Sequence, residues 1–113
     1  MLPLAERLRA NVQFQQVFRE GRSFAEGPLV LTVRRMDDES IRHCGFSVSK
    51  KVGNAVKRNK VKRRLREAYR ALLPQLPRGY DAVIVARSHA FTSNLESLAN
   101  AMARAFQRAG LVD

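Results

Sequence analysis

The residues best suited to chemistry in this sequence are the cationic side chains between Lys50 and Arg70. Ten of these 21 positions are Lys or Arg, and one, Glu67, is acidic. Because the formal net charge of the whole chain is +11, most of its positive charge belongs to this segment. Guanidinium and ammonium groups donate hydrogen bonds and cannot accept them, and dense groups of them bind phosphate oxygens. The segment therefore predicts a surface for a polyanion, with nucleic acid as the expected partner.

Side chains that could catalyse bond cleavage show no comparable concentration. His43 and His89 lie far apart in the sequence without an evident nucleophile, so a structural or solvent-facing role is expected for each. Cys44 is the single cysteine, and no CxxC or Cys/His cluster around it indicates a metal site. It falls in a strand-like run, where a small core residue is expected. We predict no catalytic residue and no protein-borne metal site.

One long helix must position most of the cations. Asn54 is a favourable N-cap, and the pattern predicts a helix from Ala55 to Leu73 that Pro74 ends. At about 100° per residue, an apolar stripe that would pack on a sheet consists of Val61, Leu65, Ala68 and Leu72. The opposite side carries Asn59, Arg63, Arg66 and Arg70, with Lys60 and Lys62 on its flanks. Because almost no acid relieves the repulsion within this face, a bound polyanion is favoured over a merely solvated surface.

The other predicted elements are two helices and several strands. The first helix is expected from Asn11, acting as N-cap, to Glu20, with Gly21 ending it in the left-handed conformation. Strands are predicted at 28–36, 42–49 and 81–87, and a short strand at 22–25 is a further candidate. A last helix is expected to start in a capping box over 93–96. Its apolar stripe consists of Leu95, Leu98, Met102 and Phe106.

This order of elements predicts an α+β fold in one domain, 1–113, with helices packed on a single sheet. The acidic loop 37–40 predicts an antiparallel hairpin between 28–36 and 42–49. If 42–49 and 81–87 pair in parallel through the basic helix, the general rule predicts a right-handed crossover. No apolar run is long enough for a signal peptide or a membrane-spanning helix, so a cytoplasmic protein is expected.

The run from Phe46 to Arg70, FSVSKKVGNAVKRNKVKRRLREAYR, resembles the signature of the bacterial ribonuclease P protein family. That signature joins a strand ending in a Ser/Lys run, a G-N-A-V cap, an Arg-Asn-Arg core and K-R-x-x-R on the helix. The matching residues are Ser47, Ser49, Lys50, Lys51, Gly53, Asn54, Ala55, Val56, Arg58, Asn59, Lys62, Arg63 and Arg66. Lys60 departs from the core by replacing an Arg, which keeps the charge but loses bidentate geometry. The segments 14–24 and 81–87 resemble the family's first helix and last strand, so the resemblance covers nearly the whole chain.

The resemblance implies a left-handed β-α-β crossover, against the general rule, and two RNA-binding surfaces. The surface for a catalytic RNA subunit would consist of Arg58, Asn59, Lys60, Lys62, Arg63 and Arg66. The cleft for a single-stranded 5′ leader would contain Phe14, Phe18, Lys50, Lys51, Ser47 and Ser49. For Phe14 and Phe18, packing in the core is an equally good interpretation, and both stay open. Several family members carry a tyrosine where this chain has Thr32, so one stacking contact is expected to be missing.

The function implied by the resemblance is that of the protein subunit of ribonuclease P, which removes the 5′ leader from precursor tRNA. Hydrolysis would take place at Mg²⁺ ions bound mainly by the RNA subunit, with one protein, monomeric when free, per RNA. A ribosomal or ribosome-assembly protein, which would share the size and charge, is the main alternative. A DNA-binding module is disfavoured because no helix-turn-helix or dimer heptad is recognisable. Membrane-surface binding is disfavoured because the basic helix lacks bulky Trp or Phe residues.

Overall fold

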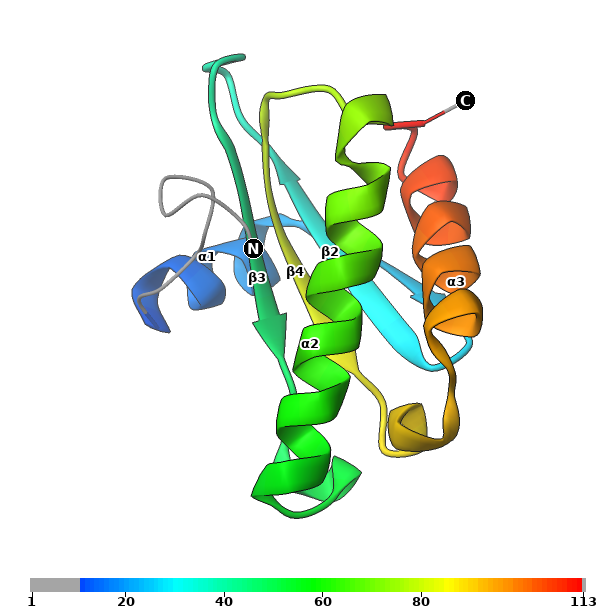
Figure 1. Cartoon of the computed structure of the whole chain (residues 1–113). Helices are drawn as coiled ribbons and strands as arrows, with labels where there is room; N and C mark the ends of the chain where they lie inside the picture. Colours follow the sequence, from blue (N-terminus) through cyan, green and yellow to red (C-terminus); the bar gives the residue numbers. More distant parts are fainter. Residues whose placement is uncertain (1–10, 113) are drawn as a thin grey trace.

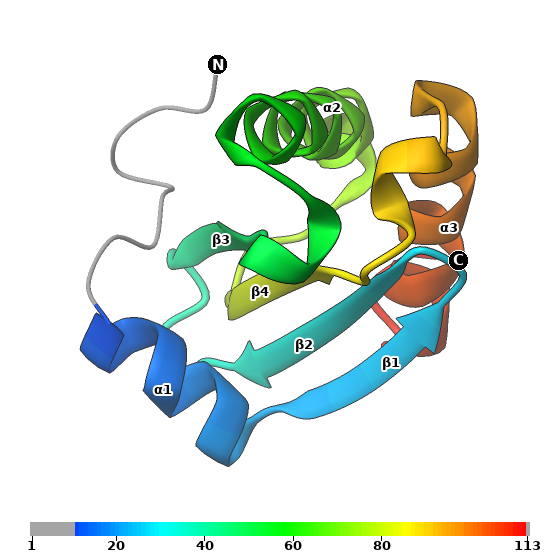
Figure 2. The ribbon, with the colours of Figure 1, turned by 90° about the horizontal axis from the view of Figure 1, so that it is seen from below.

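The computed structural model describes residues 11–112, and a four-stranded sheet with helices on both faces organises them (Figures 1 and 2). The main elements are α1 (Asn11–Glu20), β1 (Arg22–Glu26), β2 (Leu29–Arg35), β3 (Arg42–Ser47), α2 (Ala55–Leu72), β4 (Tyr80–Ala86) and α3 (Leu95–Arg108). Short 3₁₀ turns cover Lys50–Val52, Leu73–Gln75 and Ala90–Thr92. The α+β prediction and the predicted order are confirmed, including the short strand β1.

The strand order is β1-β2-β4-β3, so the predicted hairpin between β2 and β3 is wrong. β4 lies between them, antiparallel to β2 and parallel to β3. The reason is the composition of β4, in which six of seven residues are buried, because a strand that is apolar on both faces belongs inside a sheet. The loop after β2 crosses the start of β4 instead, where the Met36 amide donates to the Gly79 carbonyl at 2.9 Å.

The β3-α2-β4 connection is left-handed, as the family resemblance implies and against the general rule. In Figure 1, β3 and β4 both run downward, α2 lies in front of them, and β4 is to the right of β3. With this strand order, a right-handed connection would place α2 on the face that α1 occupies. α2 instead lies beside α3 on the face opposite α1 (Figure 2), and its apolar stripe packs into the core there.

The two faces of the sheet have cores of very different size. α2 and α3 cover the larger core, where the buried Tyr69 and Tyr80 hydroxyls lie 2.7 Å apart. α1 lies on the other face, where Val17 and Val83 form a small buried cluster. α1 therefore leaves part of its face of the sheet accessible to solvent, since Ala25 is exposed and Val30 and Val85 are half-buried.

Side chains and backbone contacts set the helix ends. Asn54 caps α2 as predicted, because its Oδ1 accepts from the Lys57 amide at 3.0 Å. For α3 the cap is Asn94, whose Oδ1 accepts from the Ser97 amide at 2.8 Å, so the predicted capping box led by Ser93 is wrong. α1 begins at Asn11 itself, and the capping expected of the Asn11 side chain lies outside the described part of the structure.

Gly21 ends α1 for a reason other than the predicted left-handed conformation. Its φ is not positive; instead, a Cβ at this position would lie 2.5 Å from the Val17 carbonyl oxygen and 2.7 Å from that of Val33. Glycine is required there because the backbone of α1 approaches β2 closely. Among residues 11–112, no helix is both long and apolar enough to cross a membrane.

Candidate nucleic-acid interface

The orientation of α2 follows from its apolar stripe. Val61, Leu65 and Ala68 are buried as predicted, Leu72 packs at the edge of the core, and Tyr69 also becomes buried. Packing of this stripe on the sheet turns the opposite side of the helix toward solvent. Cations therefore cover the exposed side of α2, and none of the described α2 side chains forms an ion pair with a described acid.

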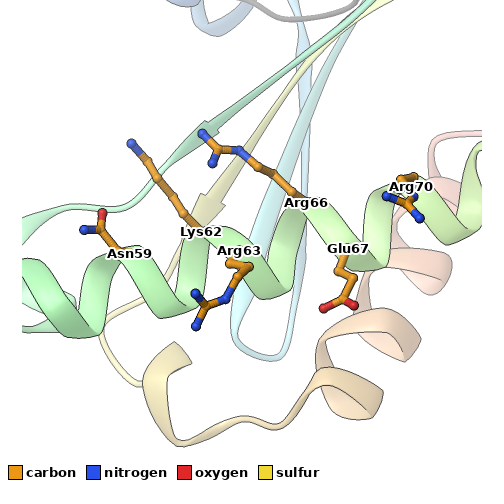
Figure 3. Close-up of a pocket in the computed structure, with 6 residues that line it drawn as sticks. All are labelled: Asn59, Lys62, Arg63, Arg66, Glu67 and Arg70. Atoms are coloured by element: carbon orange, nitrogen blue, oxygen red, sulfur yellow. The ribbon is translucent and has the colours of Figure 1, made fainter. Parts of the chain in front are cut away.

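Six of these side chains line a hollow of about 560 Å³ on the exposed side of α2 (Figure 3). They are Asn59, Lys62, Arg63, Arg66, Glu67 and Arg70. In Figure 3 the Lys62 and Arg66 side chains extend to one side of the helix, and those of Arg63 and Glu67 extend to the other. Long donors that spread from one helix face can bind several phosphate oxygens at once.

The structure brings together four of the six residues predicted to contact an RNA subunit: Asn59, Lys62, Arg63 and Arg66. Lys60 is exposed but does not line the hollow. Arg58 is partly buried, and its enclosed Nε has no hydrogen-bond partner among the described residues. Glu67 and Arg70 also line the hollow. Neither was among the residues predicted for this site, although helical spacing predicts Arg70 on the same face.

Arg64 is a cation of α2 that contacts other parts of the fold and not only solvent. Its guanidinium Nη1 donates to the carbonyl oxygens of Phe91 at 3.1 Å and Ser93 at 3.3 Å. The guanidinium also lies 5.5 Å from the centre of the Phe91 ring, and the Lys57 ammonium lies 5.1 Å from the same ring. Both contacts are within the range of cation–π attraction. Arg64 therefore fastens α2 to the 3₁₀ turn that precedes α3.

The second predicted surface lies near α1. Phe14 is partly buried and packs on the Val17–Val83 cluster beside Val85, whereas Phe18 is 48% exposed. Ser47 is opposite Val85 in the parallel pairing of β3 and β4, and it is half-buried. The two interpretations left open for the phenylalanines thus separate: Phe14 contributes to packing, and Phe18 leaves an aromatic surface open to solvent.

The other predicted leader-binding residues lie in the turn between β3 and α2. Lys50, Lys51 and Ser49 are exposed, and the Ser49 hydroxyl accepts from the Lys51 amide at 3.3 Å, so it also caps the turn. Thr32, where a tyrosine is common in the family, is buried, and its hydroxyl lies 2.9 Å from that of Ser23. At this position, β2 therefore has a hydroxyl that pairs with Ser23 of β1, in place of an aromatic ring.

The histidines, Cys44 and Tyr69 lie away from the cationic face of α2. His43 Nδ1 lies 2.7 Å from Asp81 Oδ1, and His89 is exposed. Cys44 is fully buried as predicted, and burial raises the pKa of its thiol far above the ordinary value. Burial likewise raises the pKa of Tyr69. Within residues 11–112, no three His, Cys, Asp or Glu side chains gather where they could hold a metal ion.

Comparisons with known proteins agree with this arrangement. A family model described as Ribonuclease P matches residues 2–110. The ribonuclease P protein component of Roseiflexus castenholzii is 43% identical over 109 residues, covering 96% of this chain and 88% of the relative. The RNase P protein of Staphylococcus aureus superimposes with a TM-score of 0.82 at 30% identity, covering 96% of this chain and 99% of the other. That of Thermotoga maritima gives a TM-score of 0.80 at 30% identity, covering 91% and 96%.

Proposed function

The chain belongs to the ribonuclease P protein family, and from this premise we propose that it is the protein subunit of a bacterial ribonuclease P. In this proposal it binds the catalytic RNA subunit and the 5′ leader of precursor tRNA. It thereby assists the endonucleolytic cut that produces the mature 5′ end of tRNA. It would act in the cytoplasm as one protein, monomeric when free, per RNA.

The observation that carries the proposal is the exposed cationic face of α2, whose cations form no ion pair with a described acid. Binding to a folded RNA would relieve this repulsion and release counterions from the phosphates. We assign Arg58, Asn59, Lys60, Lys62, Arg63 and Arg66 to this contact. Arg70 lines the same hollow and joins them.

For the leader we propose the exposed part of the sheet beside α1. The open ring of Phe18 supports this assignment, because unpaired bases stack on aromatic rings for about 1 to 3 kcal/mol each. Lys50 and Lys51 would bind leader phosphates, with Ser47 and Ser49 as polar neighbours. Phe14 would act mainly by holding α1 on the sheet, since it packs on the Val17–Val83 cluster.

Magnesium belongs to the RNA in this proposal. Mg²⁺ prefers hard oxygen ligands, and the phosphate groups of an RNA supply such oxygens in large number. The ion would supply activation of the attacking water and stabilisation of the leaving oxygen. The protein would contribute affinity for the leader and neutralisation of phosphate charge, and it would not cleave RNA alone.

The deciding experiment mixes the purified chain with a bacterial ribonuclease P RNA at low Mg²⁺ and measures 5′ processing of a precursor tRNA. We expect the protein to raise the rate strongly at an Mg²⁺ concentration where the RNA alone is nearly inactive. Absence of stimulation together with tight binding to ribosomal RNA would instead favour a ribosomal role.

A further inference from the structure

Glu67 is an acid in the cationic face of α2. It lines the hollow together with Asn59 and four cations, and Figure 3 shows its carboxylate extending from the helix on the same side as Arg63. The side chain is exposed and forms no hydrogen bond or ion pair with another described residue. No residue of the range 11–112 therefore occupies its carboxylate oxygens, which can accept hydrogen bonds from a ligand.

Helix stability does not account for this acid. Arg63 precedes Glu67 by four residues, which is the less favourable order for an ion pair on a helix. Arg70 follows it by three residues, and neither arginine approaches the Glu67 carboxylate within ion-pairing distance. Glu67 also lies in the middle of α2, away from the N-terminal turn where an acid would interact favourably with the helix dipole.

Hydrogen-bond chemistry distinguishes Glu67 from its neighbours. Lys and Arg side chains only donate, and phosphate oxygens only accept, so the cations suit an RNA backbone. An ionised carboxylate only accepts and repels phosphate, so it has no use on a face that binds phosphates alone. RNA offers suitable donors in its 2′-hydroxyl groups and in the exocyclic amines of its bases.

We propose that Glu67 accepts a hydrogen bond from a 2′-hydroxyl or an exocyclic amine of the RNA subunit, so that α2 recognises one donor group among the phosphates it binds. The inference rests on the proposed function of α2. At 1.5 Å per residue, Arg63 and Arg70 lie about 6 Å and 5 Å along the helix axis from Glu67. Phosphates bound on both sides would bring the RNA close to the carboxylate.

The sign of one mutational effect tests the proposal. The affinity of a bacterial ribonuclease P RNA is measured for the wild-type chain, Glu67→Ala and Glu67→Gln at fixed Mg²⁺ and several salt concentrations. We expect Glu67→Ala to weaken binding about ten- to a hundredfold, as for the loss of a hydrogen bond to a charged group. Glu67→Gln should recover most of the affinity, because its carbonyl oxygen still accepts.

Two results would overturn the proposal. If Glu67 is only a solvated acid, its removal takes negative charge away from a phosphate-binding face, and Glu67→Ala should bind RNA more tightly than the wild type. If Glu67→Gln binds RNA as weakly as Glu67→Ala, affinity depends on the negative charge of Glu67 and not on its ability to accept a hydrogen bond. A carboxylate that holds a cation would give that result. Since the residue is exposed, both variants are expected to fold.

The donor group can be identified with modified RNA. RNA pools that contain 2′-deoxynucleotides, or analogues lacking an exocyclic amine, are selected for binding to the wild type and to Glu67→Ala. A position at which a modification weakens wild-type binding but not that of the variant identifies the donor and its kind. If no such position exists in either pool, the proposed contact is refuted.

Arg63→Ala separates failure of this inference from failure of the proposed function. That variant should bind RNA more weakly, with a log–log salt slope shallower by about one unit. If the wild type does not bind the RNA, or Arg63→Ala changes neither affinity nor slope, the assigned surface of α2 is wrong. If Arg63→Ala behaves as expected and Glu67→Ala tightens binding, only the role of Glu67 is refuted.

Discussion

At the residue scale, similar side chains in this protein have different tasks because their surroundings differ. Phe14 packs on a buried valine pair, while Phe18, one helical turn later, is 48% exposed. Arg63 extends into solvent, and its neighbour Arg64 binds two backbone carbonyl groups. The contact of each side chain, more than its type, decides whether it is available to RNA.

The phenylalanine pair gives a prediction at this scale. Phe18→Ala should weaken binding of a precursor tRNA with its leader by about 1 to 3 kcal/mol, the value of one stacked base, and leave binding of mature tRNA unchanged. Affinities of the holoenzyme for the two RNAs measure the difference. Phe14→Ala is the matched comparison, because it should lower thermal stability. Equal losses for both RNAs would show that Phe18 does not contact the leader.

At the scale of elements, α2 is held by its apolar stripe on the sheet and by Arg64 at the turn before α3. The stripe fixes which face of the helix points outward. Arg64, at the middle of α2, and Lys57, in its first turn, both contact Phe91 in that turn. This second attachment joins the proposed RNA-binding helix to the element that follows β4.

Replacement of Arg64 should therefore cost stability. Arg64→Met removes two hydrogen bonds from a charged donor and a cation–π contact, so we expect about 1 to 3 kcal/mol of destabilisation in urea unfolding with an unchanged m value. The control is Arg66→Met, which removes an exposed arginine of the same helix and should change stability by less than about 0.5 kcal/mol. A loss in Arg66→Met as large as that in Arg64→Met would contradict the attachment.

At the scale of the whole molecule, the charge is unbalanced. The chain carries +11 overall, and each of the ion pairs Arg34–Glu20, Arg104–Glu26 and Arg108–Glu26 has one exposed and one partly exposed partner, so they contribute little stability. Repulsion within α2 opposes folding and is screened by salt. The stability of the free protein should therefore depend on ionic strength more than that of a neutral domain of its size.

Thermal unfolding can measure this dependence. Raising NaCl from 50 to 300 mM should raise Tm by about 4 °C, which corresponds to roughly 1 kcal/mol of relieved repulsion. Sulfate at equal ionic strength should raise it further, because a divalent anion can bind among the arginines. In the double variant Arg63→Ala, Arg66→Ala the rise should be smaller. An unchanged or lower Tm in salt would show that the cationic face does not destabilise the free chain.

The sequence predicted the local features of this fold well and its long-range ones poorly. The stripe Val61–Leu65–Ala68 and the Asn54 cap follow from spacing and side-chain chemistry within one helix. The position of β4 between β2 and β3 depends on pairing between segments that are distant in the sequence. The acidic loop 37–40 is local, and it indicated only that β2 and β3 are connected by a turn. The close approach at Gly21 likewise depends on Val33, twelve residues away.

The residues of the proposed site likewise fall into those that local sequence could predict and those that depend on the fold. Its cations were predictable because charge and helical period are local properties, and Arg63 and Arg66 lie on the exposed face as expected. Arg64 could not be recognised as structural, because its partners belong to a turn nearly thirty residues later. Glu67 was visible in the sequence as the acid of the segment, and its place in the hollow depends on which side of α2 faces solvent.

The central position of β4 also affects how the chain is made. β4 is the fourth strand in sequence, yet β2 and β3 each pair with it and not with each other. While the ribosome is still synthesising α2, only the β1–β2 hairpin can form, and β3 has no neighbouring strand. The basic helix thus leaves the ribosome before its supporting sheet can be completed, and the nascent protein cannot form the proposed RNA-binding surface before residue 86 has emerged.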